Sequence, residues 1–244
     1  MKWDRTKGRP EPIRALNRIR ELENNEPLVD LREVAPAARI ARDTVIPFVR
    51  RRVAEMVQEA AVSLPEGIYL GIVDAWRPFV RQVRIYEWMM GNVEVAFPDM
   101  PYAQRRRKVC RWVAPVDQKA PPGHCTGAAV DILLLDEQNE PLDLTAPFER
   151  FAASPTWTLG LTEEAARNRF MMVDAMLNVG FSNCRDEYWH YSWGDAGWAV
   201  RMGETECVYG LVELPEEIWA VKQAEWEEVL VSRPNPFLPA SPEA

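Results

Sequence analysis

The chain has 244 residues, of which 47% are hydrophobic and 27% charged, a composition typical of a soluble globular protein that buries its own core. Its net charge of −8 excludes general nucleic-acid binding, which needs a basic surface. No stretch approaches the ~18 apolar residues of a membrane-spanning helix, and the first residues lack the apolar segment of a signal peptide. We therefore expect a cytoplasmic protein.

The first 43 residues are polar and contain several prolines, and we expect them to wrap around the domain as an arm with a short helix near 13–22. Between 49 and 60, apolar residues recur with the spacing of one helix face, and the sequence LPEG at 64–67 ends this helix.

The apolar run at 68–73 predicts a buried strand that carries the sequence DAWRP, at 74–78, at its carboxyl end. Pro78 suits the first position of a following helix. The expected buried face of that helix consists of Phe79, Val83, Tyr86 and Met90. Residues 91–123 are rich in proline and arginine, and we expect them to form an irregular connection.

A second apolar strand is predicted at 129–135. Thr162 then has the character of a helix N-cap, and Gly180 is the expected end of that helix. The expected buried stripe of this helix is Ala166, Phe170, Val173 and Leu177. An aromatic segment at 188–193 predicts a further strand.

The alternation of helices and strands predicts an α+β fold with a small, mainly antiparallel sheet flanked by helices. We expect a single domain over residues 1–232, including the arm at 1–43. Residues 233–244 are rich in proline, and we expect them to form a flexible tail.

The chain contains only two histidines, and each lies near an acid. His124 opens the sequence HCTGAAVD, which ends at Asp131, and His190 closes the sequence EYWH, which begins at Glu187. Because a neutral imidazole is the commonest metal ligand in proteins, both histidines are candidate ligands.

Asp131 lies inside an apolar strand, where an unpaired carboxylate costs several kcal/mol. A metal ion would compensate this charge, and Gly127 can supply the bend that brings His124 and Asp131 together. A carboxylate hydrogen-bonded to loop amides would explain this motif alone equally well.

The second motif favours the metal. His190 added to His124 and Asp131 gives three ligands and leaves the fourth position of a zinc site open, as in catalytic zinc sites. Glu187 can then lie beside the metal-bound water and accept its proton. An exposed strand with clustered aromatic residues would explain the aromatic side chains of this segment, but not the two histidines with acidic neighbours.

Arg77 lies at the carboxyl end of the first strand, between Trp76 and Pro78. A fixed guanidinium there can stabilise the negative charge that develops on a carbonyl oxygen during peptide hydrolysis. An ion pair with Asp74 is the simpler interpretation of Arg77 taken alone.

Together the segments 74–78, 124–131 and 187–191 resemble the D-alanyl-D-alanine dipeptidases of the VanX type, over roughly residues 28–210. The resemblance implies a fold of the hedgehog or lysostaphin-like D,D-peptidase group and one Zn²⁺ per chain, held by His124, Asp131 and His190. It further implies that Glu187 is the general base and that Arg77 stabilises the tetrahedral intermediate. Members of this family cleave D-Ala-D-Ala into two D-alanines, a reaction connected with peptidoglycan and the cell wall.

Two departures from the family pattern concern substrate recognition. The family places a serine two residues before the first histidine ligand, where this chain has Pro122. The segment after residues 29–32 is also shortened, over residues 36–44.

The expected partner is therefore a small dipeptide, D-Ala-D-Ala or a close relative, and neither a nucleic acid nor a membrane. A D,D-carboxypeptidase or endolysin-type peptidase acting on peptidoglycan stem peptides is the second hypothesis. A noncatalytic zinc-stabilised binding protein is the third.

Overall fold

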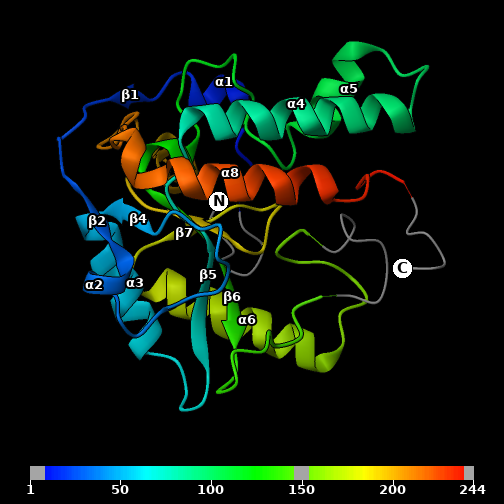
Figure 1. The fold of residues 1–244 in the computed structure, drawn as a ribbon. Helices are drawn as coiled ribbons and strands as arrows, with labels where there is room; N and C mark the ends of the chain where they lie inside the picture. The colour runs from blue at the N-terminus through cyan, green and yellow to red at the C-terminus, as the bar shows by residue number, and fades with distance from the viewer. Residues whose placement is uncertain (1–8, 146–153, 239–244) are drawn as a thin grey trace.

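The structure is a computed structural model that describes residues 9–145 and 154–238. Helices and strands are interspersed along the chain, and the longer helices surround one principal sheet (Figure 1). The helices are α1 (Ile13–Leu16), α2 (Leu31–Val34), α3 (Arg51–Val62), α4 (Phe79–Ala96), α5 (Tyr102–Val109), α6 (Glu163–Asn178), α7 (Ala196–Met202), α8 (Glu216–Ser232) and the 3₁₀ helix η1 (Gly123–Thr126). The strands are β1 (Arg20–Glu21), β2 (Leu28–Asp30), β3 (Arg39–Ile40), β4 (Phe48–Arg50), β5 (Tyr69–Asp74), β6 (Ala129–Leu135), β7 (Ser182–Asn183), β8 (His190–Ser192) and β9 (Glu206–Cys207).

The principal sheet has five strands in the order β3-β5-β6-β8-β7. Only the pair β3–β5 is parallel, while β5–β6, β6–β8 and β7–β8 are antiparallel. The predicted α+β fold with a mainly antiparallel sheet is confirmed. The predicted strand at 129–135 coincides with β6, and the strand predicted at 68–73 is β5 shifted by one residue.

The main core lies between one face of this sheet and helices α3 and α6. Successive side chains of a strand point to opposite faces, so Val130, Ile132 and Leu134 of β6 point into this core and are fully buried. Asp131 lies on the alternate face. The strand therefore has one apolar face for the core and a second face that can carry a polar side chain.

The buried faces of α4 and α6 differ from the expected stripes. Phe79 and Phe170 are exposed, although both were expected in the core. The buried faces instead carry polar residues, Arg81 and Gln82 in α4 and Arg169 in α6. Their polar groups are hydrogen-bonded; Arg169, for example, donates to the carbonyl oxygens of Leu144 and Pro155. Tyr86, Val173 and Leu177 are buried as expected, so the pattern of apolar residues finds part of each face and misses its polar members.

The expectation of an irregular connection at 91–123 is wrong for two parts of this segment, which are helical. Helix α4 continues to Ala96, and α5 occupies Tyr102–Val109. A second apolar cluster, centred on Tyr86, Met89 and Val93, forms where α4 packs with α5. Two arginines of α5 pair with acids, Arg105 with Glu94 and Arg106 with Asp117.

Helix α8 runs alongside α4 in Figure 1. The contact is polar as well as apolar, because Arg81 of α4 donates to Gln223 and to the carbonyl oxygen of Lys222, and its guanidinium lies over the ring of Trp226. The segment expected to be a flexible tail begins after α8. Its described part is attached to α4, since Asn235 donates to the carbonyl oxygen of Asn92 and Phe237 packs against the second cluster.

The N-terminal residues that the structure describes follow the surface and join several elements. The helix expected near 13–22 is limited to the four residues of α1. Further along, β1 pairs with β9, β2 pairs with β4, and β3 becomes an edge strand of the principal sheet. None of the helices in the described ranges is long and apolar enough to cross a membrane.

Gly127 forms the bend between η1 and β6. Its φ of +70° lies in the left-handed region, and a Cβ at this position would overlap with Leu28 Cδ2. The Gly127 carbonyl oxygen also accepts the backbone N–H of Arg50 at 2.8 Å. The predicted bend between the first two candidate ligands is therefore present and requires glycine.

We predict that Gly127→Ala lowers the free energy of unfolding by more than the roughly 1–2 kcal/mol cost of a left-handed alanine, because the new methyl group also displaces Leu28. Urea denaturation measures this difference. Gly203→Ala is the matched control, because Gly203 has a similar φ of +82° but no atom lies within 4 Å of the point that a methyl group would occupy there. Equal losses in the two variants would contradict the predicted steric contribution.

Candidate active site

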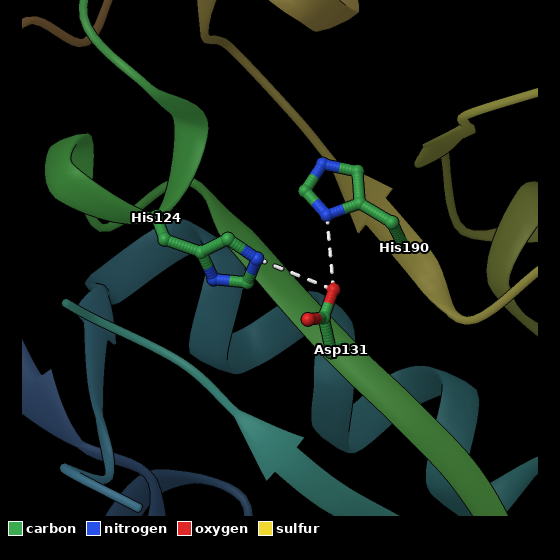
Figure 2. Close-up of side chains that lie close together, drawn as sticks. All are labelled: His124, Asp131 and His190. Atoms are coloured by element: carbon green, nitrogen blue, oxygen red, sulfur yellow. Dashed lines mark hydrogen bonds and ion pairs between the residues drawn. The ribbon is translucent and has the colours of Figure 1, made fainter. Parts of the chain in front are cut away.

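The two histidine motifs meet on the face of the sheet opposite the main core. His124 belongs to η1, Asp131 to β6 and His190 to β8, and Asp131 is directly paired with His190 in the sheet. Both imidazoles point at one carboxylate oxygen (Figure 2): Asp131 Oδ1 lies 3.2 Å from His124 Nε2 and 2.9 Å from His190 Nδ1. One possible ligand atom from each residue lies within 4.8 Å of the others.

The tautomer of His124 is fixed by a backbone group. Its Nδ1–H donates to the carbonyl oxygen of Ala75 at 2.8 Å, so the neutral ring presents a lone pair at Nε2. That lone pair faces the oxygen of Asp131, which is also an acceptor. Two acceptors at this distance require a positive charge between them, either a proton or a metal ion.

The charges of the three residues are strongly linked. Burial by itself raises the pKa of Asp131, but His124 and His190 hold that pKa well below its usual range. Burial also opposes the charged form of His124, and the Asp131 carboxylate raises the pKa of this histidine overall. The donor set of two imidazole nitrogens and one carboxylate oxygen suits Zn²⁺ and leaves a coordination position open. The residues present therefore fit the expected metal.

Arg77 lies at the end of β5, beside this cluster. Its Nη2 and Nε bond to Asp74 Oδ2 at 2.6 and 3.2 Å, and its Nη1 donates to Gln82 Oε1 at 2.6 Å. The backbone N–H of Arg77 donates to the carbonyl oxygen of His124 at 3.2 Å. The ion pair with Asp74, the simpler interpretation of Arg77, is therefore present, and it fixes the guanidinium close enough to Asp131 and His124 for their charges to interact.

Glu187 lies in the turn before β8, where its carbonyl oxygen accepts the backbone N–H of His190 at 3.2 Å. Burial raises the pKa of the Glu187 carboxyl well above its usual range, and the charges of Asp131 and Glu11 raise it further. Within the described residues, the Glu187 carboxylate has no hydrogen-bond partner.

All five residues expected at the site line one cavity of about 760 Å³. Residues that the sequence did not indicate line it as well, among them Gln82 and Glu11. Glu11 comes from the N-terminal segment and pairs with the fully buried Arg201. Neither Gln82 nor Glu11 has a sequence signal of its own, because each is placed by a contact with an arginine, Gln82 with the nearby Arg77 and Glu11 with the distant Arg201.

The two departures from the family pattern also meet this cavity. Pro122 precedes η1 and lines the wall beside His124, where it supplies neither a hydroxyl nor an N–H group. The shortened segment contributes Arg42 and Thr44 to the lining.

The family comparison agrees with the resemblance of the three motifs. Residues 29–208 match the family described as D-ala-D-ala dipeptidase, which covers all five expected site residues. The chain belongs to this family. It is therefore an enzyme of the metallopeptidase class.

Two curated relatives carry the name D-alanyl-D-alanine dipeptidase. The protein from Synechocystis sp. is 32% identical over 169 residues, which cover 58% of this chain and 68% of the relative. The protein from Escherichia coli is 26% identical over 140 residues, which cover 57% of this chain and 62%, less than two thirds, of the relative.

Two solved structures show a more distant likeness. A vancomycin resistance D,D-pentapeptidase VanY in complex with Zn(II) is 16% identical with a TM-score of 0.39. The match covers 66% of this chain and 81% of the VanY chain. VanYB in complex with D-alanine-D-alanine is 14% identical with a TM-score of 0.43. The match covers 87% of this chain and 92% of the VanYB chain.

We predict that Asp74→Ala lowers the free energy of unfolding by about 3 kcal/mol, because it leaves the guanidinium of Arg77 buried without its anion. Denaturant unfolding checks this value. The double variant Asp74→Ala/Arg77→Met is expected to be more stable than Asp74→Ala alone, since it removes the unpaired charge. A loss below about 0.5 kcal/mol in Asp74→Ala, as for an exposed pair, would contradict the proposed fixing role.

Proposed function

We propose that this enzyme is a zinc-dependent dipeptidase that hydrolyses D-Ala-D-Ala or a closely related D,D-dipeptide. The observation that carries the proposal is the convergence of His124, Asp131 and His190, together with Glu187 and Arg77, on one cavity. Family membership and the two relatives named D-alanyl-D-alanine dipeptidase support the choice of substrate.

In this proposal His124 Nε2, Asp131 and His190 Nδ1 hold one Zn²⁺. Zinc bound in this way supplies a Lewis acid that polarises a carbonyl and lowers the pKa of water. The hydrogen bond from His124 Nδ1–H to the carbonyl oxygen of Ala75 keeps Nε2 available as a ligand atom, and such outer contacts orient metal ligands.

Glu187 is the proposed general base. It accepts a proton from the attacking water and returns it to the amine that leaves when the peptide bond breaks. Its carboxylate lines the same cavity as the candidate ligands and is not committed to another hydrogen bond within the described residues.

Arg77 is proposed to stabilise the negative charge that develops on the scissile carbonyl oxygen. Asp74 and Gln82 hold its guanidinium in one orientation, so little reorganisation accompanies the reaction. One hydrogen on each of Nη1 and Nη2 is left over by these contacts and is available to a substrate oxygen.

We predict that the purified wild-type chain binds one Zn²⁺ and that zinc raises its unfolding temperature, because a ligand that binds the folded state stabilises it. Asp131→Asn is expected to weaken zinc binding by more than about 100-fold, beyond the loss typical of an outer-contact mutation. Metal analysis and thermal unfolding measure the two effects. Asp117→Asn, an exposed acid paired with Arg106, is the matched control and keeps full zinc binding.

We predict that Glu187→Ala and Glu187→Gln keep zinc but lower the rate of D-alanine release from D-Ala-D-Ala by about 10²–10⁴-fold, the usual contribution of general acid–base catalysis. The exposed Glu204, changed to Gln, serves as the control. Turnover of the Glu187 variants at the wild-type rate would exclude the proposed base.

The same release assay tests the substrate when free D-Ala-D-Ala is compared with a peptidoglycan stem peptide and with L,D-dipeptides. Preference for the free D,D-dipeptide supports a dipeptidase, whereas preference for the stem peptide indicates a D,D-carboxypeptidase. Stoichiometric zinc without hydrolysis of any of these peptides would indicate a binding protein.

A further inference from the structure

We propose that Arg42 binds the terminal carboxylate of the substrate and so sets the direction in which a dipeptide lies in the cavity. This inference rests on the proposed peptidase function and adds to it a recognition residue at the shortened segment. Arg42 lines the cavity, and within the described residues its guanidinium has no hydrogen bond, ion pair or ring contact.

The other arginines of the cavity are occupied. Arg77 is bonded to Asp74 and Gln82, and all three side-chain nitrogens of Arg81 donate to acceptors of the protein. Arg111 lies 3.7 Å from Asp186 and over the ring of Trp112. Arg233 has an interaction of its own. Arg42 is therefore the cavity arginine for which the described residues show no partner at any side-chain donor, whereas Arg77 keeps only the two N–H groups assigned above to the scissile carbonyl oxygen.

The cavity needs such a cation if its ligand is an unblocked dipeptide. Six acids line it: Glu11, Asp74, Asp131, Asp186, Glu187 and Asp195. A carboxylate that enters these surroundings is repelled unless a positive group meets it. The wall beside His124 cannot donate to it at Pro122, which has no N–H. A guanidinium binds a carboxylate through two parallel hydrogen bonds, which is the geometry required here.

The backbone around Arg42 is firmly held. The N–H of Ala41 donates to the carbonyl oxygen of Ile72 at 2.9 Å. The N–H of Val45 donates to the carbonyl oxygen of Arg42 at 3.2 Å. The carbonyl oxygen of Thr44 accepts a hydrogen bond from the buried Arg81 at 3.1 Å. Arg42 thus projects from a fixed turn, so a contact with substrate requires only its side chain to become ordered.

Sheet topology decides where this turn lies. Because β3 and β5 are parallel neighbours, their carboxyl ends reach the same edge of the sheet. Arg42 therefore follows β3 beside the end of β5, where Asp74 is the last strand residue and Arg77 follows it. The order β3-β5-β6-β8 then places Arg42, Arg77, Asp131 and His190 in sequence across the sheet. β3 lies about two strand spacings, ~10 Å, from β6.

This order gives the substrate a direction. With the scissile carbonyl between Arg77 and the candidate ligands, the carboxyl-terminal residue extends toward β3 and Arg42. The amino-terminal residue then lies on the side of β8, near the turn that carries Glu187.

The test compares Arg42→Ala with the wild type on D-Ala-D-Ala and on its C-terminal amide, which has no carboxylate. We expect KM for D-Ala-D-Ala to rise about 10- to 100-fold in Arg42→Ala, the range for a lost charge-assisted hydrogen bond, with kcat changed less than about threefold. KM for the amide is expected to be high in the wild type and unchanged by the substitution. Arg42→Lys is expected to recover part of the affinity.

Arg52→Ala is the matched control, because Arg52 is an exposed arginine of α3 that pairs with Glu59 and does not line the cavity. An equal rise of KM for both substrates in Arg42→Ala, or no rise for either, overturns the role of Arg42. The proposed function is tested separately, and it stands if the wild type hydrolyses D-Ala-D-Ala. Absence of any D,D-dipeptide hydrolysis by the wild type overturns both.

Discussion

The candidate site depends on one carboxylate held between two imidazoles. Asp131 comes from the middle of the sheet, and both histidines reach it from segments that the sheet brings together. In each contact a nitrogen lone pair of a neutral imidazole would face a carboxylate oxygen, so a proton or a metal ion has to lie between them. The protein holds them together through contacts outside the cluster: the carbonyl oxygen of Ala75 orients His124, and pairing with β6 positions His190.

The chemistry-bearing residues could be predicted because their residue types are rare and their neighbours are specific. Two histidines with acidic neighbours and a carboxylate in an apolar strand are features of the sequence itself. The contacts that orient them could not be predicted. His124 is oriented by the backbone carbonyl oxygen of Ala75, and because every residue has such an oxygen, the sequence does not indicate this contact. Gln82 reaches Arg77 because helix α4 begins shortly after Arg77.

The fold was predictable where apolar residues form a continuous run. Strand β6 coincides with its prediction for this reason, since Asp131 is its one residue that is not apolar. Helix α8 was not predicted, because its buried positions Gln223, Trp226 and Leu230 are mixed in character while Val221 and Val231 face outward. The buried faces of helices α4 and α6 were predicted only in part, since buried and hydrogen-bonded arginines occupy positions that the apolar pattern does not indicate. The place of Arg42 depends on the parallel pairing of β3 with β5, which joins segments about thirty residues apart.

The alternation along β6 has a consequence for folding accuracy. A shift of β6 by one residue against its neighbours would turn Asp131 toward α3 and α6, and Val130 and Ile132 toward the cavity. An ionised carboxylate in that apolar layer would be far more costly than a lost apolar contact. The residue proposed to hold the metal therefore also excludes the most accessible wrong pairing of the central strand, and a neutral residue at this position would remove that safeguard even in a chain never exposed to zinc.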